Sequence, residues 1–283
     1  MLLFCFNGKE DAAMGLLDGK KALITGVATR KSIAWGIAQA FHEQGAQLAF
    51  TCVQGAVPRL QKLAPLVGSD LIIPCDVQKD EEIQSAVAQA AGAFGGKLDI
   101  LVHSIAYANI DDMGGEFIKV SRAGWSLALE VSAYSLVAMA RAAHPFMKAA
   151  GGGSILALTF GGGDKVAPKD NIMGIAKAAL ESAMRYLAYD LGPENIRVNA
   201  VSPGPLPTLS SMVIEGFDTA VHLGETHSPM LRNATMEEVG KTAVYLASDL
   251  SSAITGLVHK VDCGMSSVAS PSIPRIDDKP VNP

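Results

Sequence analysis

The sequence has few of the residues from which metal sites and disulfide frameworks are built. Four cysteines and six histidines occur in 283 residues. The cysteines lie far apart, with no C-x-x-C pair and no histidine cluster at metal-ligand spacing, so we expect neither a metal site nor a set of disulfides. Reduced thiols are typical of a cytoplasmic compartment, which is the location we expect.

Charge is also sparse, and no segment concentrates it. Charged residues make up 18% of the chain, the formal net charge is -5, and no basic block stands out. This composition disfavours a nucleic-acid-binding surface and binding to an anionic membrane. No eighteen apolar residues run together, so we expect no membrane span. The apolar share of 49% instead indicates a well-buried globular protein whose partners are small molecules or copies of itself.

Buried strands alternate with helices along most of the chain. Short apolar runs, each followed by a helical pattern, indicate a parallel sheet with helices on both faces. We therefore predict an α/β protein with a Rossmann-type doubly wound parallel sheet in a single domain. The expected strands are residues 21–25, 48–52, 70–77, 98–104, 154–160, 197–201 and 256–262, and the expected helices are 34–44, 60–66, 80–94, 123–147 and 171–191.

The two ends of the chain depart from this alternation. Residues 1–13 carry no periodic pattern, and Met14 begins a segment that looks like a second start, so we assign 1–13 to an N-terminal extension. The domain should cover residues 14–270. Residues 271–283 are rich in proline and charge, and we expect them to be disordered.

A strand, a glycine turn and a helix follow one another near the start of the domain. Strand 21–25 leads into Gly26, and the turn continues to Ser32 before the helix begins. This order is typical of the phosphate-binding opening of a dinucleotide fold, where backbone N–H groups and a helix N-terminus face a pyrophosphate. The turn is not a G-x-G-x-x-G match, and a purely structural turn explains it about as well. Ser32 stands where a hydroxyl could donate to a phosphate oxygen.

The ends of the next two strands bear on the adenosine half of such a cofactor. Gln54 follows the second strand, where a dinucleotide-binding protein usually carries an acid, so the choice between NAD and NADP stays open. Arg30 and Lys31 could serve a 2′-phosphate or be solvated. Asp76 ends the third strand, where it either accepts a hydrogen bond from the adenine amino group or caps the helix near Asp80.

The stretch from Ser154 to Lys177 holds the candidate catalytic residues. A buried strand, a run of three glycines and a short loop ending at Asp170 precede a helix that carries Lys177. The two charged residues are seven positions apart, so helical spacing would point both to one side of the helix. The mouth between a strand end and the next helix is where ligands sit in α/β proteins. A lysine on a helix is, however, more often a solvated charge.

Six short motifs carry a resemblance to a known family: Thr25-Gly26 with Ser32 to Gly36, Cys75 to Val77, Val102 to Ala106, Met173 to Lys177, Arg197 to Ala200 and Gly204 to Leu209. Together they resemble the bacterial NADH-dependent enoyl-acyl carrier protein reductases, divergent members of the short-chain dehydrogenase/reductase superfamily. The resemblance covers residues 15–269. It implies a homotetramer of Rossmann subunits that uses NAD and transfers hydride to the β-carbon of an α,β-unsaturated acyl thioester in fatty-acid or polyketide-type metabolism.

The resemblance also assigns roles to single residues. Lys177 matches the family lysine, which hydrogen-bonds the nicotinamide ribose and places positive charge near the forming enolate. The pyrophosphate end of NAD would be held by Gly26, Ser32 and Ile33, and the adenosine would be surrounded by Gln54, Asp76 and Val77. The nicotinamide side would be lined by Ser104, Ile105, Ala106, Thr159, Pro205, Leu206 and Thr208. The substrate would contact Tyr107, Phe160, Leu206 and Met212.

Two departures from the family pattern fall on the reacting centre. The family carries a tyrosine seven residues before the lysine, and its phenol donates to the thioester carbonyl; here that position is Asp170. A second family tyrosine is replaced by Phe160. A preorganised donor at a forming oxyanion is worth roughly 3 kcal/mol of barrier, whereas an ionised carboxylate repels it. Asp170 could form an inert ion pair with Lys177, stay protonated and donate, or act as a general base in another reaction.

Segments around the expected pocket bear on substrate and assembly. Residues 203–212 form an apolar, proline-hinged stretch that is typical of a substrate lid. Tyr107 is the nearest phenol that could serve the pocket, or it is a packing aromatic. The helices at 123–147 and 171–191 have small-residue faces, which suit either a subunit interface or an ordinary core.

The helix after the lid carries acids where family members carry lysines and arginines that dock the acidic carrier protein. Glu215 and Asp218 stand in this stretch. Acids that face an acidic partner weaken both steering and affinity. A coenzyme A thioester or a free small molecule therefore competes with acyl carrier protein as the expected substrate.

Three functions follow from these observations. The first is NAD(H)-dependent reduction of an enoyl thioester. The second is a same-fold enzyme that has lost enoyl reduction and does other acid/base chemistry with Asp170 and Lys177. The third is a nucleotide-binding pseudoenzyme.

Overall fold

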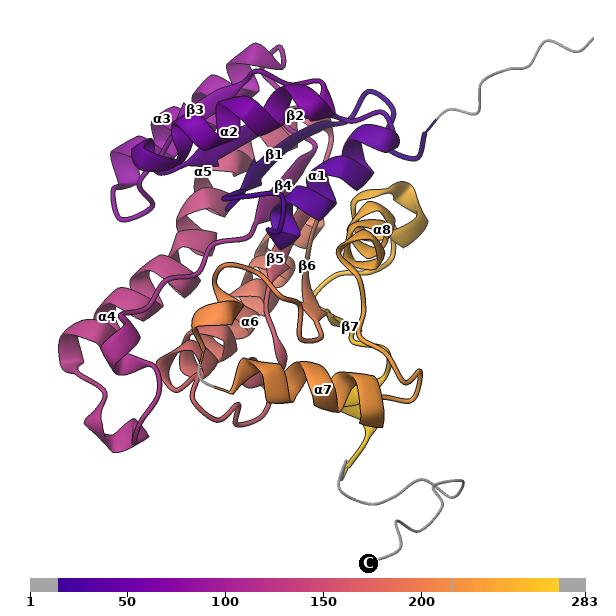
Figure 1. The fold of residues 1–283 in the computed structure, drawn as a ribbon. Coiled ribbons are helices and arrows are strands. Elements are labelled where there is room, and N and C mark those ends of the chain that lie inside the picture. Colours follow the sequence, from indigo (N-terminus) through magenta and orange to yellow (C-terminus); the bar gives the residue numbers. More distant parts are fainter. Residues whose placement is uncertain (1–14, 215, 270–283) are drawn as a thin grey trace, which may run out of the picture.

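One seven-stranded sheet runs through the centre of the structure, a computed structural model that describes residues 15–214 and 216–269 (Figure 1). Every neighbouring pair of strands is parallel, in the order β3-β2-β1-β4-β5-β6-β7. The chain thus winds outward in both directions from β1 and β4, which confirms the predicted Rossmann-type doubly wound sheet. The strands are β1 (Lys21–Thr25), β2 (Gln47–Cys52), β3 (Ile72–Pro74), β4 (Ile100–His103), β5 (Gly153–Leu158), β6 (Ile196–Pro203) and β7 (Val258–Val261).

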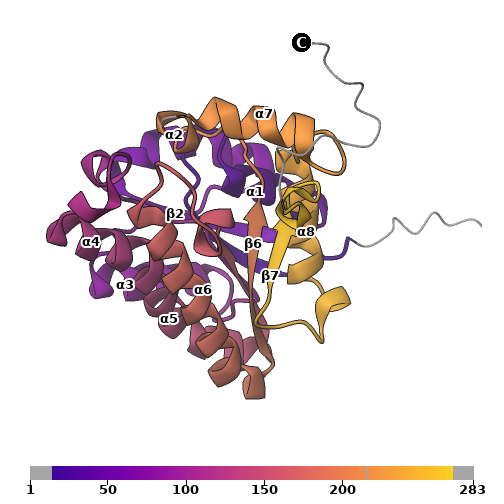
Figure 2. The ribbon, with the colours of Figure 1, turned by 90° about the horizontal axis from the view of Figure 1, so that it is seen from below.

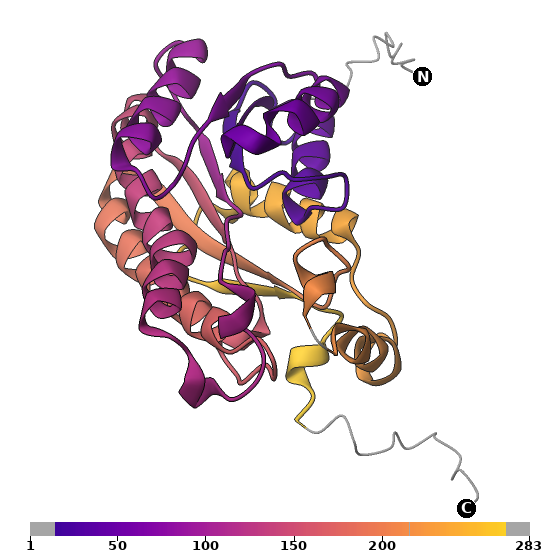
Figure 3. The same cartoon turned by 60° about the vertical axis from the view of Figure 1, so that its left-hand side comes forward.

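Helices cover both faces of the sheet, and each face has its own hydrophobic core (Figures 2 and 3). Phe41 and Phe50 are fully buried in one core, and Leu101 and Leu136 are fully buried in the other. The first face is covered by α1 (Ile33–Glu43), α2 (Val57–Leu63) and α8 (Met236–Ala247), and the second by α3 (Asp80–Ala93), α5 (Ser135–Ala150) and α6 (Ile172–Leu191). The two remaining helices are α4 (Arg122–Leu129), which packs against α6, and α7 (Phe217–His227), which follows the segment after β6.

Local sequence explains where several helices begin and end. The first turn of α3 holds acids, including Asp80 and Glu82, which the partial positive charge of a helix N-terminus favours. The start of α8 is a capping box, in which Thr235 and Glu238 each bond the other's backbone N–H. Helix α5 ends at Gly151, whose φ of 91° suits a residue without a side chain.

The expected long helix over residues 123–147 is present as one helical stretch, but its middle is not α-helical. The structure has α4, then a π-helical turn at Glu130–Tyr134, and only then α5. Such turns insert one extra residue into a helix and often mark functional sites. The alanine-rich pattern fits an uninterrupted helix equally well, so it could not reveal the turn.

Two serines, one in the π-helical turn and one directly after it, bond β4 and the segment that follows it. The hydroxyl of Ser132 accepts a hydrogen bond from the backbone N–H of Tyr107 at 2.9 Å and donates to the carbonyl of the same residue at 3.1 Å. The hydroxyl of Ser135 donates to the Val131 carbonyl and lies 2.8 Å from Nε2 of His103. The turn therefore fixes the backbone that follows β4, where the cofactor is expected.

Strand β3 is shorter than the expected 70–77. It pairs with β2 only over Ile72–Pro74, and the chain then turns. The carboxylate of Asp76 accepts from the N–H of Gln78 at 3.1 Å, which bends the chain away from the sheet. The predicted N-terminal extension and C-terminal tail, like Glu215, lie outside the described residues, so the domain boundaries stay a prediction.

One helical stretch, Arg122–Ala150, is long and apolar enough to cross a membrane by length and composition alone. It is the run from α4 through the π-helical turn into α5, and 56% of its most apolar window is buried inside the protein. Helix α5 packs against α3, α6 and β5. A core helix passes the same test, and packing on the sheet accounts for its apolar character.

Gly26 should tolerate no side chain. Its φ is +78°, and a Cβ there would lie 1.8 Å from the carbonyl oxygen of Ser104. We expect Gly26→Ala to lower the free energy of unfolding by at least about 2 kcal/mol, measured by urea denaturation. Gly55→Ala is the matched control, because a Cβ there meets nothing within 4 Å. Equal effects of the two changes would contradict this account.

Candidate active site

The carboxyl ends of β1 and β4 meet at the point where the strand order reverses. The hydroxyl of Thr25 accepts from the N–H of Ser104 at 2.9 Å, and Gly26 packs directly on the Ser104 carbonyl. Ligands of doubly wound sheets bind in the crevice at this switch point. The expected pyrophosphate residues and the expected nicotinamide residues after β4 are therefore neighbours.

The turn before α1 is organised by one hydroxyl. Ser32 Oγ accepts hydrogen bonds from the backbone N–H groups of Ala28 and Thr29, at 3.0 and 2.9 Å. Both bonds use lone pairs, so the hydroxyl proton is left for an acceptor such as a phosphate oxygen. Ser32 is also the N-cap residue of α1, and Ile33 is the first residue of this helix. Gly26, Ser32 and Ile33 thus surround a helix N-terminus, which favours anions.

The expected adenosine residues lie at the ends of β2 and β3. Gln54 is exposed in a short 3₁₀ turn after β2, and Asp76 and Val77 are partly buried after β3. Asp76 does not cap α3: the N-cap residue is Lys79, and Glu82 reaches back to the N–H of Asp76 at 2.8 Å. The capping alternative for Asp76 is therefore wrong, because its carboxylate is used in a local turn.

Lys177 is a buried ammonium and not a solvated charge. Its side chain is 5% exposed, and Nζ donates to the Leu158 carbonyl at 2.7 Å and the Ile105 carbonyl at 3.3 Å. Leu158 is the last residue of β5, and Ile105 lies two residues after β4. The lysine therefore links α6 to the ends of two strands. Burial, partly offset by the charge of Glu181, lowers the pKa of Lys177 to about 8.

Asp170 lies close to Lys177 in sequence but does not share its helix. Helix α6 begins at Ile172, so the spacing of seven residues does not place Asp170 on the same helical face, and that expectation is wrong. Among the described residues no ion pair joins the two groups, and Lys177 is not a cause of the pKa shift at Asp170. The ion-pair alternative is therefore excluded.

Asp170 sits in a strained, pinned segment. Its neighbours Lys169 and Asn171 have φ values of 73° and 33°, conformations that cost side-chain-bearing residues energy. The segment is clamped to Gly114, whose N–H bonds the Lys169 carbonyl at 2.9 Å and whose carbonyl accepts from the Asn171 amide. Burial raises the pKa of Asp170 to about 6. The backbone that carries the carboxyl is thus fixed in place, and the pKa of the carboxyl lies near 6.

Two of the three glycines after β5 leave no room for a side chain, whereas a Cβ on Gly161 would meet nothing within 4 Å. A Cβ on Gly162 would lie 2.2 Å from the ring of Phe160, and a Cβ on Gly174 would lie 2.9 Å from the Gly162 carbonyl oxygen. A Cβ on Gly163 would come within 2.5 Å of a carboxylate oxygen of Glu181. The turn therefore lies flat against α6, and Phe160 remains partly exposed beside it.

The expected substrate contacts separate into exposed and buried groups. Tyr107 and Met212 are 55% and 61% exposed, whereas Leu206 is 6% exposed and belongs to the core cluster on the α1 face. Among the expected nicotinamide residues, Thr159 and Leu206 are buried and Ala106 is exposed. The other four are partly buried: Ser104, Ile105, Pro205 and Thr208.

The lid segment is held together by a hydroxyl. Ser211 Oγ accepts from the N–H of Thr208 and lies within donating distance of the Leu206 carbonyl, both at 2.8 Å. Helix α7 follows this segment. The described lid residues thus form a folded turn whose hydrogen bonds lie within the segment.

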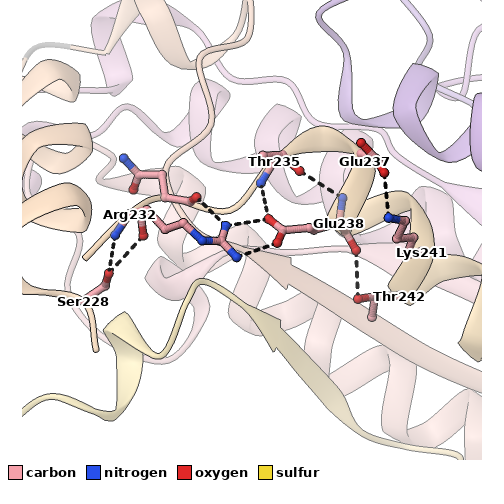
Figure 4. A network of polar contacts seen from close by, with 8 residues as sticks. Ser228, Arg232, Thr235, Glu237, Glu238, Lys241 and Thr242 are labelled. Carbon is pink, nitrogen blue, oxygen red and sulfur yellow. Dashed lines mark hydrogen bonds and ion pairs between the residues drawn. The ribbon is translucent and has the colours of Figure 1, made fainter. Parts of the chain in front are cut away.

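Beyond α7 the chain is fastened by a charged network (Figure 4). Arg232 makes two hydrogen bonds to the carboxylate of Glu238, at 2.9 and 2.7 Å, and its backbone bonds Ser228. Glu238 also accepts from the N–H of Thr235 at 2.9 Å. The arginine holds the pKa of Glu238 at about 2, so the far end of the lid region is anchored on α8 near neutral pH.

Several residues of the site were not predicted from the sequence. Glu181 stands one helical turn beyond Lys177, a spacing that places the two on one face of a helix. Ser132 lies in the unforeseen π-helical turn, and Asn171 and Ser211 read as ordinary loop residues. Within the residues that the structure describes, no cluster of three or more histidine, cysteine or acidic side chains could hold a metal, and the thiols of Cys52, Cys75 and Cys263 are free.

The fold and this arrangement define a class of protein. A phosphate-binding turn, a strand-end crevice at the switch point and a buried lysine at the carboxyl ends of β4 and β5 are the parts of a nicotinamide-dinucleotide oxidoreductase on a Rossmann fold.

Comparison with known proteins gives the family. Residues 26–266 match the family described as Enoyl-(Acyl carrier protein) reductase. The enoyl-acyl-carrier-protein reductase (NADH) of Nostoc sp. is 47% identical over 252 residues, which is 88% of this chain and 96% of the relative. The chain therefore belongs to the enoyl-acyl-carrier-protein reductase family, as the motifs predicted.

Solved structures of this family have the same fold. The Anaplasma phagocytophilum reductase in complex with NAD superposes with a TM-score of 0.87 at 40% identity, covering 92% of this chain and 98% of that one. The Bacillus cereus reductase with NADP+ and an indole naphthyridinone gives a TM-score of 0.87 at 43% identity, covering 91% of this chain and 100% of that one.

The raised pKa of Asp170 predicts a pH-dependent stability difference. Above pH 6 the native carboxyl is ionised in a site that disfavours the charge, so we expect Asp170→Asn to stabilise the protein at pH 8 by about 1–2 kcal/mol after allowance for solvent screening. As the pH falls through 6 the carboxyl becomes neutral in the native protein, and as it falls through the ordinary aspartate pKa it becomes neutral in the unfolded chain as well, so the difference should vanish near pH 3. Urea denaturation at pH 8, 6, 4 and 3 measures it.

Asp111→Asn is the matched control, since Asp111 is exposed in the β4–α4 connection. It should change stability by less than about 0.5 kcal/mol at each pH. A destabilised Asp170→Asn variant at pH 8 would show that the carboxylate has a partner in solution.

Proposed function

We propose that this protein is an NAD(H)-dependent enoyl-thioester reductase. The observation that carries the proposal is the buried Lys177 ammonium, held by the ends of β4 and β5 beside the Gly26–Ser104 contact. Membership of the enoyl-acyl-carrier-protein reductase family supports it. The substrate is then an α,β-unsaturated acyl thioester.

The residues of the switch point fit a nicotinamide dinucleotide. Gly26 leaves a cradle that a Cβ would fill, and Ser32 keeps a hydroxyl proton for an acceptor at the N-terminus of α1. When bound, the cofactor supplies the hydride. Gly26, Ser32 and Ile33 would hold its pyrophosphate, while Gln54, Asp76 and Val77 would surround the adenosine.

Lys177 provides fixed positive charge beside the reacting centre. Its two carbonyl partners orient Nζ at the strand ends, and the ammonium keeps one further proton to donate to the nicotinamide ribose. The same charge stabilises negative charge that develops on the thioester oxygen. Since its pKa is about 8, Lys177 is largely protonated at pH 7 and loses this role in more alkaline solution.

Asp170 acts in its neutral form as the hydrogen-bond donor that the family tyrosine supplies elsewhere. Its pKa of about 6 leaves roughly one carboxyl in ten protonated at pH 7. The strained segment clamped to Gly114 keeps the group in place. Reduction should therefore be slow at neutral pH and faster in mild acid.

The same pKa suits a second function. A carboxyl that titrates near 6 is also a competent general base at pH 7, as in a proton-transfer or lyase reaction on this fold. The two functions differ in the form of Asp170 that is active, so a pH profile separates them.

Assembly, location and carrier complete the proposal. Tyr186 and Tyr189 on α6 are 73% and 83% exposed, which supports a subunit interface in a homotetramer. We place the protein in the cytoplasm. The described α7 carries Asp218 and Glu225 but no lysine or arginine, which supports a coenzyme A thioester as the better substrate than the acidic carrier protein.

The first test is the pH dependence of NADH oxidation with crotonyl-coenzyme A between pH 5 and 9. If neutral Asp170 donates, kcat should be level below pH 6 and fall about tenfold per unit above it, with a further fall above pH 8 as Lys177 loses its charge. Asp170→Asn keeps a donor at every pH, so this variant should be at least about tenfold faster than the wild type at pH 8 and lose the limb near pH 6.

No NADH oxidation by the wild type, together with a proton-transfer or lyase activity that Asp170→Asn abolishes, would instead support the general-base function. Joint Asp170→Tyr and Phe160→Tyr changes should raise kcat by roughly 10² at pH 8, since they restore ionisation-resistant donors. If none of these proteins shows turnover but all of them bind NADH, the nucleotide-binding pseudoenzyme is the function that remains.

The carrier preference is tested with crotonyl thioesters of coenzyme A and of acyl carrier protein. We expect kcat/KM to be at least about tenfold higher with coenzyme A. Asp218→Lys with Glu225→Lys, exposed residues on one side of α7, should raise kcat/KM for the carrier protein and leave the coenzyme A value within about twofold. A preference for the carrier protein in the unchanged protein would refute this part.

A further inference from the structure

Glu181 is a buried carboxylate to which the mechanism above gives no part. The residue lies on α6 and is 7% exposed. One of its carboxylate oxygens accepts a hydrogen bond from the Thr159 hydroxyl at 2.6 Å. Burying a carboxylate is costly unless it is bonded and close to positive charge. Such a group needs an explanation in the site that surrounds it.

Three segments of the site meet at this carboxylate. Thr159 directly follows β5, and Glu181 lies one turn beyond Lys177 on the same face of α6. The backbone of Gly163 covers it, because a Cβ there would lie 2.5 Å from Glu181 Oε1 and 3.2 Å from the Lys177 carbonyl carbon. The carboxylate thus joins the end of β5, the glycine turn and the lysine-bearing helix.

Glu181 is also the charged neighbour that acts on Lys177. Of the described groups, it is the one whose field raises the pKa of the lysine against the lowering by burial. His103 on β4 is close enough to feel Lys177, but burial lowers its pKa to about 3 and it is neutral. Four other charged residues stand on, or just before, elements that pack against this part of α6. None of them is a cause of the pKa shift of Lys177: Asp164, Asp170, Glu130 and Arg197.

We infer that Glu181 is a positioning residue of the reductase site, which orients Thr159 through a hydrogen bond and sets a fixed negative charge beside Lys177. It acts through these two residues and does not touch the substrate. The inference rests on the proposed function, in which Lys177 binds NADH and charges the site.

Glu181→Gln separates the charge from the shape. The amide oxygen can still accept from Thr159, while the negative charge beside Lys177 is gone. We expect the alkaline limb of both kcat and NADH affinity to move to lower pH. At pH 8 the dissociation constant for NADH should rise at least about threefold, whereas at pH 6.5 both quantities should stay within about twofold of the wild type. Fluorescence titration with NADH measures the affinity without any turnover.

A second background tests whether the effect passes through the lysine. Arginine does not deprotonate in this pH range, so Glu181→Gln added to Lys177→Arg should move no alkaline limb in NADH binding. Glu194→Gln is the control for the chemical change, because the partners of this carboxylate are His144 and Lys148. It should leave the NADH profile of the wild type unchanged.

Two results would overturn the inference. One is a Glu181→Gln profile that superposes on the wild type at all pH values. The other is a uniform loss of NADH affinity at every pH, which a merely structural carboxylate would give. Because the readout is NADH binding, a protein that binds NADH but reduces no enoyl thioester would defeat the proposed function and still test Glu181.

Discussion

The buried ammonium of Lys177 is the interaction on which the rest of the site depends. An ammonium removed from water must find acceptors, and here the acceptors are carbonyls at the ends of β4 and β5. These carbonyls converge only because the strands are parallel neighbours in the sheet. The lysine therefore requires the sheet order, the close approach at Gly26 and the glycine turn that lets α6 lie against β5. The fold and the site therefore depend on the same packing: backbone carbonyls bind the ammonium, and the charge of Glu181 on the same helix raises its pKa.

Burial acts on the two ionisable residues of this site in opposite directions. It lowers the pKa of Lys177 to about 8 and raises that of Asp170 to about 6. Both groups then titrate near neutrality without forming an ion pair, whereas direct pairing would drive their pKa values apart. A site of this kind can hold a proton on either group at physiological pH. This property suits acid/base chemistry, and it follows chiefly from burial, with the charge of Glu181 offsetting part of the shift at Lys177.

The sequence predicted the fold well because the same local pattern recurs at each strand and helix. Apolar runs at the strands, each followed by a helical pattern, suffice for the sheet, and six motifs identify the family. The geometry of Asp170 could not be predicted, since the start of α6 depends on the Asn171 bond to Gly114 from a distant segment. The π-helical turn is set by side-chain bonds of Ser132 to Tyr107, which no local pattern encodes. Glu181 was overlooked because one acid on a helix is usually solvated, and only packing reveals its burial.

The surrounding structure is compatible with Phe160 and Asp170 at the two positions where the family motifs predict tyrosines. Phe160 keeps an aromatic ring over Gly162, so replacing a phenol there removes a hydroxyl without opening a cavity. Asp170 stands on a segment whose strained backbone is fixed by Gly114, independently of the residue's own side chain. Neither change disturbs the carbonyls that hold Lys177 or the turn at Gly26. In the proposed function, chemistry at the substrate oxygen can therefore differ from that of the relatives without any change in the contacts that organise Gly26 and Lys177, because the two halves of the site are supported by different contacts.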